Sequence, residues 1–353
     1  MRVWIDMNNS PHPLLFAPVA RRLQADGHEV LVTARDNAQT VSLTLERWPD
    51  AEIFGTESPP HRAAKVASLG RRFSELRRWA AAARPDVALS HNSYAQIVTA
   101  KSLRVRVVTA MDFEHQPANH LAFRLAHTVL LPEALPARLV RRQGARARKV
   151  RHYPGLKEEL YLADFEPDPT VEERIGVRRN GDTALVVVRT PPSRATYHQF
   201  DNLVFEAALR RVCSQSDVVC VVLPRHAEQR EEIELLGLSN CVVCDQAVDS
   251  RSLMSGADLV LGAGGTMTRE AALLGVPVYS LFAGRAATVD DWLIQRGLLR
   301  RLERAEDLPV VTRRLDRSST LEELARRAQP ILQTFVDVTL ARGAGARQAG
   351  VAE

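Results

Sequence analysis

Short apolar segments rich in valine and leucine alternate with helical patterns along this chain, in two separate series. Such alternation is typical of parallel sheets covered by helices on both faces. The strands expected in the first series are VWIDM (3–7), EVLVTAR (29–35), AEIFGT (51–56), VALSHNS (87–93), VRVVTAMD (105–112) and HTVLLPEAL (127–135). Those expected in the second series are TALVVVRT (183–190), VVCVVLPR (218–225), CVVCDQ (241–246), ADLVLGAGG (257–265) and VPVYSLF (276–282).

A segment with prolines, acidic residues and no strand pattern, 155–177, separates the two series. The length of 353 residues also exceeds the size at which one hydrophobic core stops growing. We therefore predict an α/β protein with two Rossmann-like, doubly wound parallel-sheet domains that face a cleft. The predicted parts are an N-terminal domain at 1–160, a linker at 161–180, a C-terminal domain at 181–325, and a helix and tail at 326–353.

The net charge of +5 favours an anionic partner, such as a nucleotide, a phosphorylated lipid or a membrane surface. No pattern of a nucleic-acid-binding module is present, so nucleic acid is not expected as a partner. The first residues, MRVWIDMNNSPH, hold too short an apolar run for a secretory signal, and no run reaches the length of a membrane span. These features predict a cytoplasmic protein.

Two sequence patterns could suggest a metal site. Cys241 and Cys244 form a C-x-x-C, but positions i and i+3 of a strand point to opposite faces, so we expect core cysteines there. The acidic residues at 164, 166 and 168 approach a D-x-D pattern, but they lie in the proline-bearing connection. The expectation is a protein with no metal ligands and metal-independent chemistry.

The most informative segment is ADLVLGAGGTMTREAALLGVPVYSLF (257–282), in which a strand ends in glycines and a helix begins at Thr266 or Met267. Glycines allow backbone N–H groups to approach a ligand, and a helix N-terminus favours a diphosphate. Glu270, one turn into the helix, could accept hydrogen bonds from ribose hydroxyls. The alternative is an ordinary tight turn, with Glu270 favoured by the helix dipole. The pattern is not G-x-G-x-x-G, which argues against a dinucleotide cofactor.

This segment resembles the nucleotide loop of GT-B glycosyltransferases and of the UDP-N-acetylglucosamine 2-epimerases. The spacing G-G-x-x-x-x-E from Gly264 to Glu270 is most similar to that of the bacterial N-acetylglucosaminyltransferase that completes lipid II. By this resemblance, Gly264, Gly265 and Thr266 would face the phosphates, and Glu270 would face the ribose. The segment WIDMNNSPHPLLFAPVARRLQADGHEVLVTAR (4–35) resembles the first strand, loop, helix and strand of the same superfamily. A GT-B-like fold is therefore implied.

Three segments together, WIDMNNSPH, LVTARDNAQT and GAGGTMTREAALLGVPVYSLF, resemble an uncharacterised family of GT-B-like microbial proteins, a domain of unknown function. That resemblance covers nearly the whole chain. It supports the fold and brings no established reaction.

Glycosyl transfer without a metal needs a general base and positive groups that stabilise the departing diphosphate. His12, on the loop after the first strand, could act as base or orient an acceptor, or it could simply cap a helix. Asp112 and Glu114 follow a strand at the same edge, and Glu114 matches a catalytic glutamate of the epimerases. Those enzymes also use a carboxylate after the preceding strand, where this chain has His91 and Asn92. This departure argues against a 2-epimerase mechanism.

Arg189 and Arg225 follow two strands of the second series, and either could pair with a diphosphate. Solvated arginines at strand ends are the alternative, and the segment RTPPSRATYH departs from the glycine-rich, histidine-containing segment of the epimerases. The basic and aromatic helix near 69–84 could lie on an anionic membrane or could be an ordinary surface helix.

The function predicted is a metal-independent, sugar-nucleotide-dependent glycosyltransferase, with UDP-sugar as the expected co-substrate and no further cofactor. The donor would bind the second domain, and a lipid-linked or glycan acceptor would bind the first. Two alternatives are an epimerase or hydrolase of the sugar nucleotide, and a non-catalytic nucleotide-binding protein of the same fold.

Overall fold

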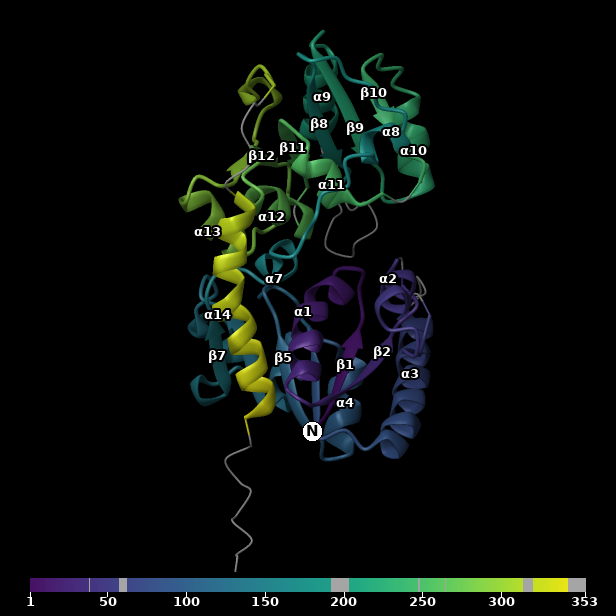
Figure 1. Cartoon of the computed structure of the whole chain (residues 1–353), viewed down its shortest axis with the longest axis vertical. Helices are drawn as coiled ribbons and strands as arrows, with labels where there is room; N and C mark the ends of the chain where they lie inside the picture. The colour runs from purple at the N-terminus through teal and green to yellow at the C-terminus, as the bar shows by residue number, and fades with distance from the viewer. Residues whose placement is uncertain are drawn as a thin grey trace, which may run out of the picture. The chain divides into compact units, whose positions relative to one another are not determined.

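The structure is a computed structural model that describes residues 1–37, 39–56, 62–191, 203–246, 248–263, 265–313 and 320–341. The chain divides into two compact units, each built around its own parallel sheet (Figure 1). The first unit holds Met1–Tyr161 together with Arg327–Glu353, and the second holds Leu162–Arg326. The predicted α/β class, with two parallel-sheet domains, is confirmed.

The first unit contains a seven-stranded sheet in the order β3-β2-β1-β4-β5-β6-β7, and all its strand pairs are parallel. Its strands are β1 (Arg2–Met7), β2 (Glu29–Ala34), β3 (Glu52–Ile53), β4 (Val87–Ser90), β5 (Arg106–Ala110), β6 (Thr128–Pro132) and β7 (Val150–Tyr153). The strand order reverses direction between β1 and β4, so the carboxyl ends of these two strands form a switch point where such folds bind ligands.

Helices flank the first sheet, and side chains such as Trp4, Phe16 and Phe123 form its buried core. The helices are α1 (Pro11–Ala25), α2 (Thr40–Arg47), α3 (Arg62–Ala83), α4 (Tyr94–Ser102), α5 (Asn119–Leu125), α6 (Ala137–Val140), α7 (Glu158–Leu162) and α14 (Thr320–Leu340), with short 3-10 turns η1 (Arg141–Gln143) and η2 (Ala147–Lys149). Helix α14 packs on this sheet through Phe335, whose ring lies 5.2 Å from that of Tyr153.

The second unit contains a six-stranded sheet in the order β10-β9-β8-β11-β12-β13, again with parallel pairs. Its strands are β8 (Ala184–Arg189), β9 (Val218–Leu223), β10 (Cys241–Val243), β11 (Leu259–Gly262), β12 (Val278–Ser280) and β13 (Arg300–Arg301). Its helices are α8 (Val171–Arg174), α9 (Leu203–Cys213), α10 (Ala227–Glu234), α11 (Ser250–Ser255), α12 (Thr266–Leu273) and α13 (Thr288–Gln295), with η3 (Ala305–Asp307).

Every strand expected from the sequence is present, and two further strands, β7 and β13, were not expected. Both lack a recognisable pattern. In β7 two exposed residues lie between two buried ones, which is not the alternation of a strand, and β13 consists of two exposed arginines. Within the described residues, no helix has the length and apolar character needed to cross a membrane.

Candidate functional site

The glycine turn of the second unit joins β11 to α12 at the carboxyl edge of the sheet. Gly262 ends the strand, and a Cβ at this position would lie 2.7 Å from Thr268 Oγ1, so only glycine fits without displacing that hydroxyl. Gly265 has φ of +89°, a backbone conformation that side chains disfavour. Thr266 begins the helix directly after it. Gly264, also predicted to face the phosphates, lies outside the described residues.

Glu270 lies one turn into α12, as the sequence indicated, but its side chain is only 4% exposed. Its neighbour Arg269 is also buried and donates a hydrogen bond of 2.8 Å to Asp290 of α13. The start of α12 is therefore held by buried polar contacts. A role of Glu270 toward a ribose stays a prediction.

Arg189 and Arg225 lie at the same edge of the second sheet. Arg189 is the register partner of Gly262 on the adjacent strand β8, and its guanidinium donates two bonds of 3.1 Å to the carbonyl oxygens of Leu223 and Pro224. Arg225 donates through Nε to the carbonyl oxygen of Thr190. Burial, and then the positive charge of Arg225, lowers the pKa of Arg189 to about 10. Two cations thus lie close together at this edge, one of them on the strand next to the glycine turn. An anion there would offset their repulsion.

Four loops bring the polar residues of the first unit together at the carboxyl edge of its sheet. His12 lies in the first turn of α1, and not on the preceding loop as we expected, because the helix begins at Pro11. Its Nδ1 accepts a hydrogen bond of 3.1 Å from the backbone N–H of Asn8. Burial, followed by the charges of His91 and Lys157, holds the pKa of His12 well below its ordinary value. His12 is therefore neutral, and its proton is on Nε2.

A chain of titratable groups continues from His12. The ring of His91 lies 5.2 Å from that of His12, and His91 Nε2 lies 3.3 Å from Asp112 Oδ1. The other carboxylate oxygen of Asp112 is bound by Lys157 Nζ, which also contacts Glu158 Oε1 at 2.6 Å. Lys157 is only 5% exposed, so this ion pair is shielded from water.

Lys157 was missed by sequence reasoning, which placed it in the inter-domain connection. It follows β7, a strand whose pattern was not recognised, and only that strand brings it to the common edge. Glu114, the residue that matches the epimerase glutamate, is buried nearby in the loop after β5, with Oε1 3.4 Å from His115 Nε2. The structure thus brings His12, Asp112 and Lys157 together in one cluster.

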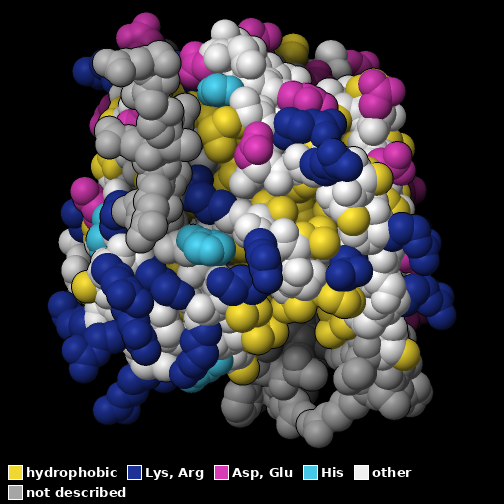
Figure 2. All heavy atoms as spheres, turned by 90° about the horizontal axis from the view of Figure 1, so that it is seen from below, with side chains coloured by type: hydrophobic (Ala, Val, Ile, Leu, Met, Phe, Trp, Pro, Cys, Tyr) yellow, Lys and Arg dark blue, Asp and Glu magenta, His cyan; other side chains and the backbone are white. Residues whose placement is uncertain are grey.

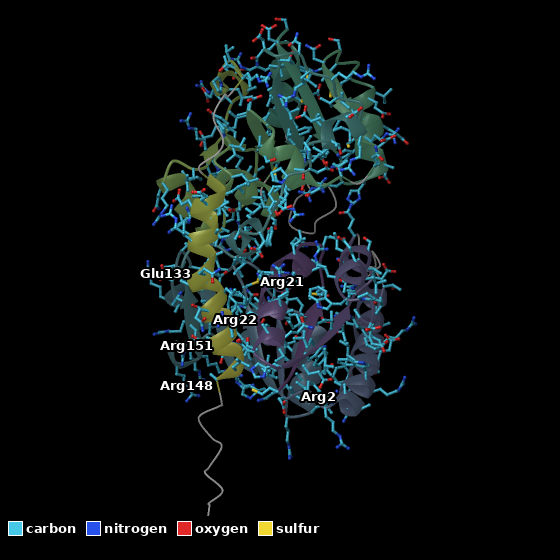
Figure 3. All side chains as sticks on the ribbon, viewed as in Figure 1. Arg2, Arg21, Arg22, Glu133, Arg148 and Arg151 are labelled. Atoms are coloured by element: carbon cyan, nitrogen blue, oxygen red, sulfur yellow. The ribbon has the colours of Figure 1, made fainter. Side chains whose placement is uncertain are left out.

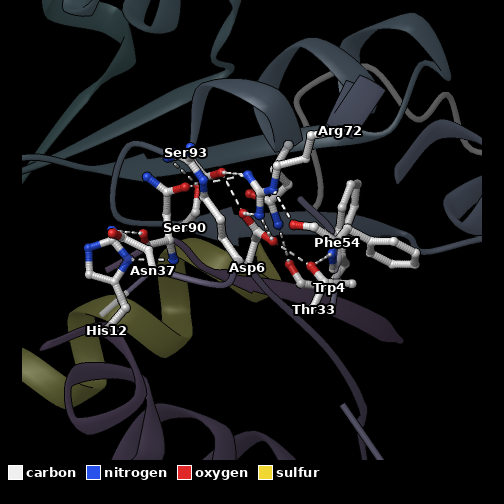
Figure 4. A network of polar contacts seen from close by, with 12 residues as sticks. Trp4, Asp6, His12, Thr33, Asn37, Phe54, Arg72, Ser90 and Ser93 are labelled. Atoms are coloured by element: carbon white, nitrogen blue, oxygen red, sulfur yellow. Dashed lines mark hydrogen bonds and ion pairs between the residues drawn. The ribbon is translucent and has the colours of Figure 1, made fainter. Parts of the chain in front are cut away.

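A buried ion pair holds two of the loops that carry this cluster (Figure 4). Arg72 of α3 donates through Nη2 to both carboxylate oxygens of Asp6 at 2.9 Å. Asp6 also accepts hydrogen bonds from Thr33 and Ser93, and Arg72 Nη1 reaches Asn8 Oδ1 at 3.4 Å. The segments that lead into His12 and His91 are thereby tied to one buried carboxylate. Arg72 is not a surface residue of a basic helix, which corrects the surface interpretation of 69–84 for this position.

Two parallel-sheet units of this kind, with a glycine turn before α12 in the second, are typical of a GT-B-like fold. Residues 1–334 match the model of a family described as a protein of unknown function, DUF354, and the chain belongs to that family. A relative in Methanocaldococcus jannaschii, the uncharacterized protein MJ0665, is 26% identical over 300 residues, which cover 83% of this chain and 85% of that protein.

Solved structures share the whole fold at low sequence identity. The UDP-GlcNAc 2-epimerase of Neisseria meningitidis, bound to UDP-GlcNAc, superimposes with a TM-score of 0.60 at 15% identity over 96% of this chain and 91% of that one. MurG of Acinetobacter baumannii superimposes with a TM-score of 0.53 at 16% identity over 96% of this chain and 99% of that one. The structural neighbours therefore include both GT-B glycosyltransferases and UDP-GlcNAc 2-epimerases, and at these identities they establish the fold.

Proposed function

We propose that this protein is a metal-independent glycosyltransferase that uses a sugar nucleotide, with UDP-sugar as the donor. The observation that carries the proposal is the glycine turn at the start of α12, together with Arg189 on the neighbouring strand and Arg225 close to Arg189. Free backbone N–H groups and two guanidinium groups suit a diphosphate. The structural neighbour that holds UDP-GlcNAc supports the choice of donor class.

In the proposed reaction, the acceptor hydroxyl oxygen bonds to the anomeric carbon of the donor sugar. The bond from that carbon to the diphosphate breaks, and its electron pair leaves with the diphosphate. Arg189, Arg225 and the amide groups at the start of α12 stabilise the negative charge that develops there.

The proton of the acceptor passes to a carboxylate of the first unit, and we assign this role to Glu114. Asp112 is less suitable because Lys157 already binds its carboxylate. His12 is less suitable because its Nε2 carries a proton and its Nδ1 is occupied by Asn8. His12 acts instead as a hydrogen-bond donor that orients the acceptor.

A thermal-shift screen with UDP, GDP, dTDP, CMP and their sugar conjugates tests the donor site. A ligand at 100 times its dissociation constant adds about 2.7 kcal/mol of stability, which corresponds to roughly 5–10 °C in melting temperature for units of this size. We expect a shift with one nucleotide family, reduced in Arg189→Gln and in Glu270→Gln. The exposed Arg178→Gln, in the same unit, is the matched control. No shift with any nucleotide would overturn the proposal.

Turnover tests the chemistry separately from binding. Glu114→Gln is expected to retain the nucleotide-induced shift and to lose about 10²- to 10⁴-fold in transfer rate, the usual contribution of a general base. Nucleotide binding without turnover on any acceptor would identify a non-catalytic binding protein.

Epimerisation of the sugar nucleotide is the second candidate, and one contact favours it. Although the loop after β4 has no acid of its own, Asp112 supplies a carboxylate 3.3 Å from His91 on that loop. An epimerase acts on the donor alone, whereas a transferase needs an acceptor. Product analysis after incubation with donor only, with His91→Asn as the variant, separates the two reactions.

The acceptor is proposed to be anionic, for example lipid-linked, because the first unit is rich in basic residues. Residues 134–156 contain seven Lys or Arg and no Asp or Glu. Arg148 and Arg151 are exposed and point outward in Figure 3. Figure 2 shows Lys and Arg side chains gathered over part of one face of the molecule.

A further inference from the structure

Three of the four cysteines meet in the second unit, although they are scattered in the sequence. Cys213 ends α9, Cys220 lies within β9, and Cys241 begins β10. Cys220 and Cys241 are register partners on adjacent parallel strands. The three Sγ atoms all lie within 4.8 Å of one another. Cys244, the other member of the C-x-x-C, does not belong to this group.

The surroundings of the group are apolar, and one of its three members is partly exposed. Cys213 and Cys220 are buried in the core of the second sheet with Leu209 and Val212. Cys241 is only partly buried, and it lies on β10, the edge strand of the sheet. Cys241 is therefore the member of the group that an ion from solvent would meet first.

The three sulfur atoms come from three different elements, and they converge without a disulfide between any two of them. The thiolate is the form of cysteine that binds metal ions. Three sulfur atoms within 4.8 Å of one another, held in apolar surroundings, offer a site for a thiophilic cation.

We propose that Cys213, Cys220 and Cys241 bind one thiophilic d10 divalent cation of the Zn²⁺ or Cd²⁺ class. Zinc–sulfur bonds of about 2.3 Å place three thiolates roughly 3.8 Å apart, which a small contraction of the present arrangement reaches. The fourth ligand is water at the partly exposed Cys241. Binding as three thiolates displaces the thiol protons, up to three per ion.

This site has a structural role, separate from the proposed sugar-nucleotide reaction. The cysteines lie on α9, β9 and β10, whereas the glycine turn follows β11, and β8 separates β9 from β11 in the sheet. A bound ion would join the edge strand β10 and the end of α9 to β9. Its expected effect is a higher melting temperature, with no change in nucleotide binding.

Cadmium titration of the reduced, chelator-treated full chain tests the proposal. We expect an ultraviolet thiolate-to-cadmium absorption band that saturates at one equivalent, with up to three protons released per ion as the thiols become bound thiolates. Cys241→Ser is expected to lower the affinity at least tenfold and to reduce the band. This variant is chosen because Cys241 is the most accessible of the three, and its melting temperature without metal verifies that it is folded.

Cys244→Ser is the matched control, since it alters the same C-x-x-C but not the cluster, and it should bind cadmium like the unaltered chain. The proposal is overturned if no band appears, if folded Cys241→Ser gives the same titration, or if Cys244→Ser loses the band. Loss of two thiols to a disulfide under mild oxidation, with no metal uptake by the reduced chain, would also overturn it.

Discussion

At the scale of single residues, the buried neutral imidazole of His12 makes the stability of the first unit depend on pH. Its pKa is lowered in the folded chain, chiefly by burial, so the unfolded chain takes up a proton first as the pH falls. The contribution of neutral His12 to the free energy of unfolding is therefore complete above the ordinary pKa of histidine, near 6.5. This contribution is lost progressively as the pH falls below that value.

Replacement of His12 by asparagine should remove this dependence, because an amide can accept the bond from Asn8 but does not titrate. Between pH 7 and pH 5, the free energy of unfolding of the unaltered chain should fall by up to about 1.4 kcal/mol more per pH unit than that of His12→Asn. Urea unfolding at several pH values measures this slope. The exposed His152→Asn should retain the slope of the unaltered chain, and equal slopes in all three proteins would contradict the prediction.

Sequence reasoning located His12, Asp112 and Glu114 because each closely follows a buried strand, and parallel strands end at one edge. It could not locate Lys157, whose position depends on β7. It also could not separate Arg72 from Arg71, since adjacent arginines in a basic helix give the same pattern. Only the packing of α3 on β1 makes one of them a buried partner of Asp6.

At the scale of secondary-structure elements, the pair of Asp6 and Arg72 joins β1 to α3, and the bond from Ser93 adds the start of α4. Both charged side chains are almost completely buried, with 0% and 3% exposure. Removal of one partner leaves the other charge uncompensated in a medium of low dielectric constant.

Arg72→Met should therefore lower the free energy of unfolding by about 3–5 kcal/mol. The exposed neighbour Arg71→Met should change it by less than about 0.5 kcal/mol. Chemical denaturation compares the two variants. Adding Asp6→Asn to Arg72→Met should restore part of the loss, and a double variant no more stable than Arg72→Met would contradict the assignment.

The turn between β11 and α12 gives a second prediction at this scale. A side chain at Gly265 would strain the backbone, although a Cβ would meet no atom within 4 Å. Gly265→Ala should thus lower the free energy of unfolding by about 1–2 kcal/mol through backbone strain alone. It should also weaken the nucleotide-induced thermal shift. Gly181→Ala, also in open space but without a positive φ, is the control and should leave both quantities unchanged.

At the scale of the whole molecule, the two units carry opposite net charge. The first unit, residues 1–161 and 327–353, holds 27 Lys and Arg against 17 Asp and Glu, and the second holds 20 against 25. A net positive unit attracts anionic lipid surfaces, and this attraction decreases as salt screens the charges.

We accordingly expect the protein to sediment with vesicles that contain anionic lipid, and not with neutral vesicles, at low ionic strength. Arg148→Glu combined with Arg151→Glu should reduce the bound fraction several-fold. Arg178→Glu combined with Arg285→Glu, two exposed positions of the second unit, should have little effect. Equal binding by both double variants would show that the basic surface of the first unit does not direct the interaction.

The overall architecture could be predicted from the sequence because buried parallel strands are continuous apolar runs, and the sequence contains eleven such runs. The sheet on which the C-terminal helix packs could not be predicted from the sequence. An amphipathic pattern shows that α14 buries one face, but it does not show which sheet covers that face. The contacts of Arg106 with the carbonyl oxygens of Val338 and Thr339, and of Arg327 with Glu159, assign it to the first unit.

The packing of the C-terminal helix α14 on the first unit affects how the chain folds during synthesis. Ile331 and Phe335 are fully buried in a unit whose sheet is complete by residue 153. On the ribosome, the first unit emerges before α14 has been synthesised. The apolar surface that α14 covers would stay exposed until the second unit has been made. Domains generally fold as units during synthesis, and a unit kept open in this way is exposed to aggregation. The domain begun first is thus completed last.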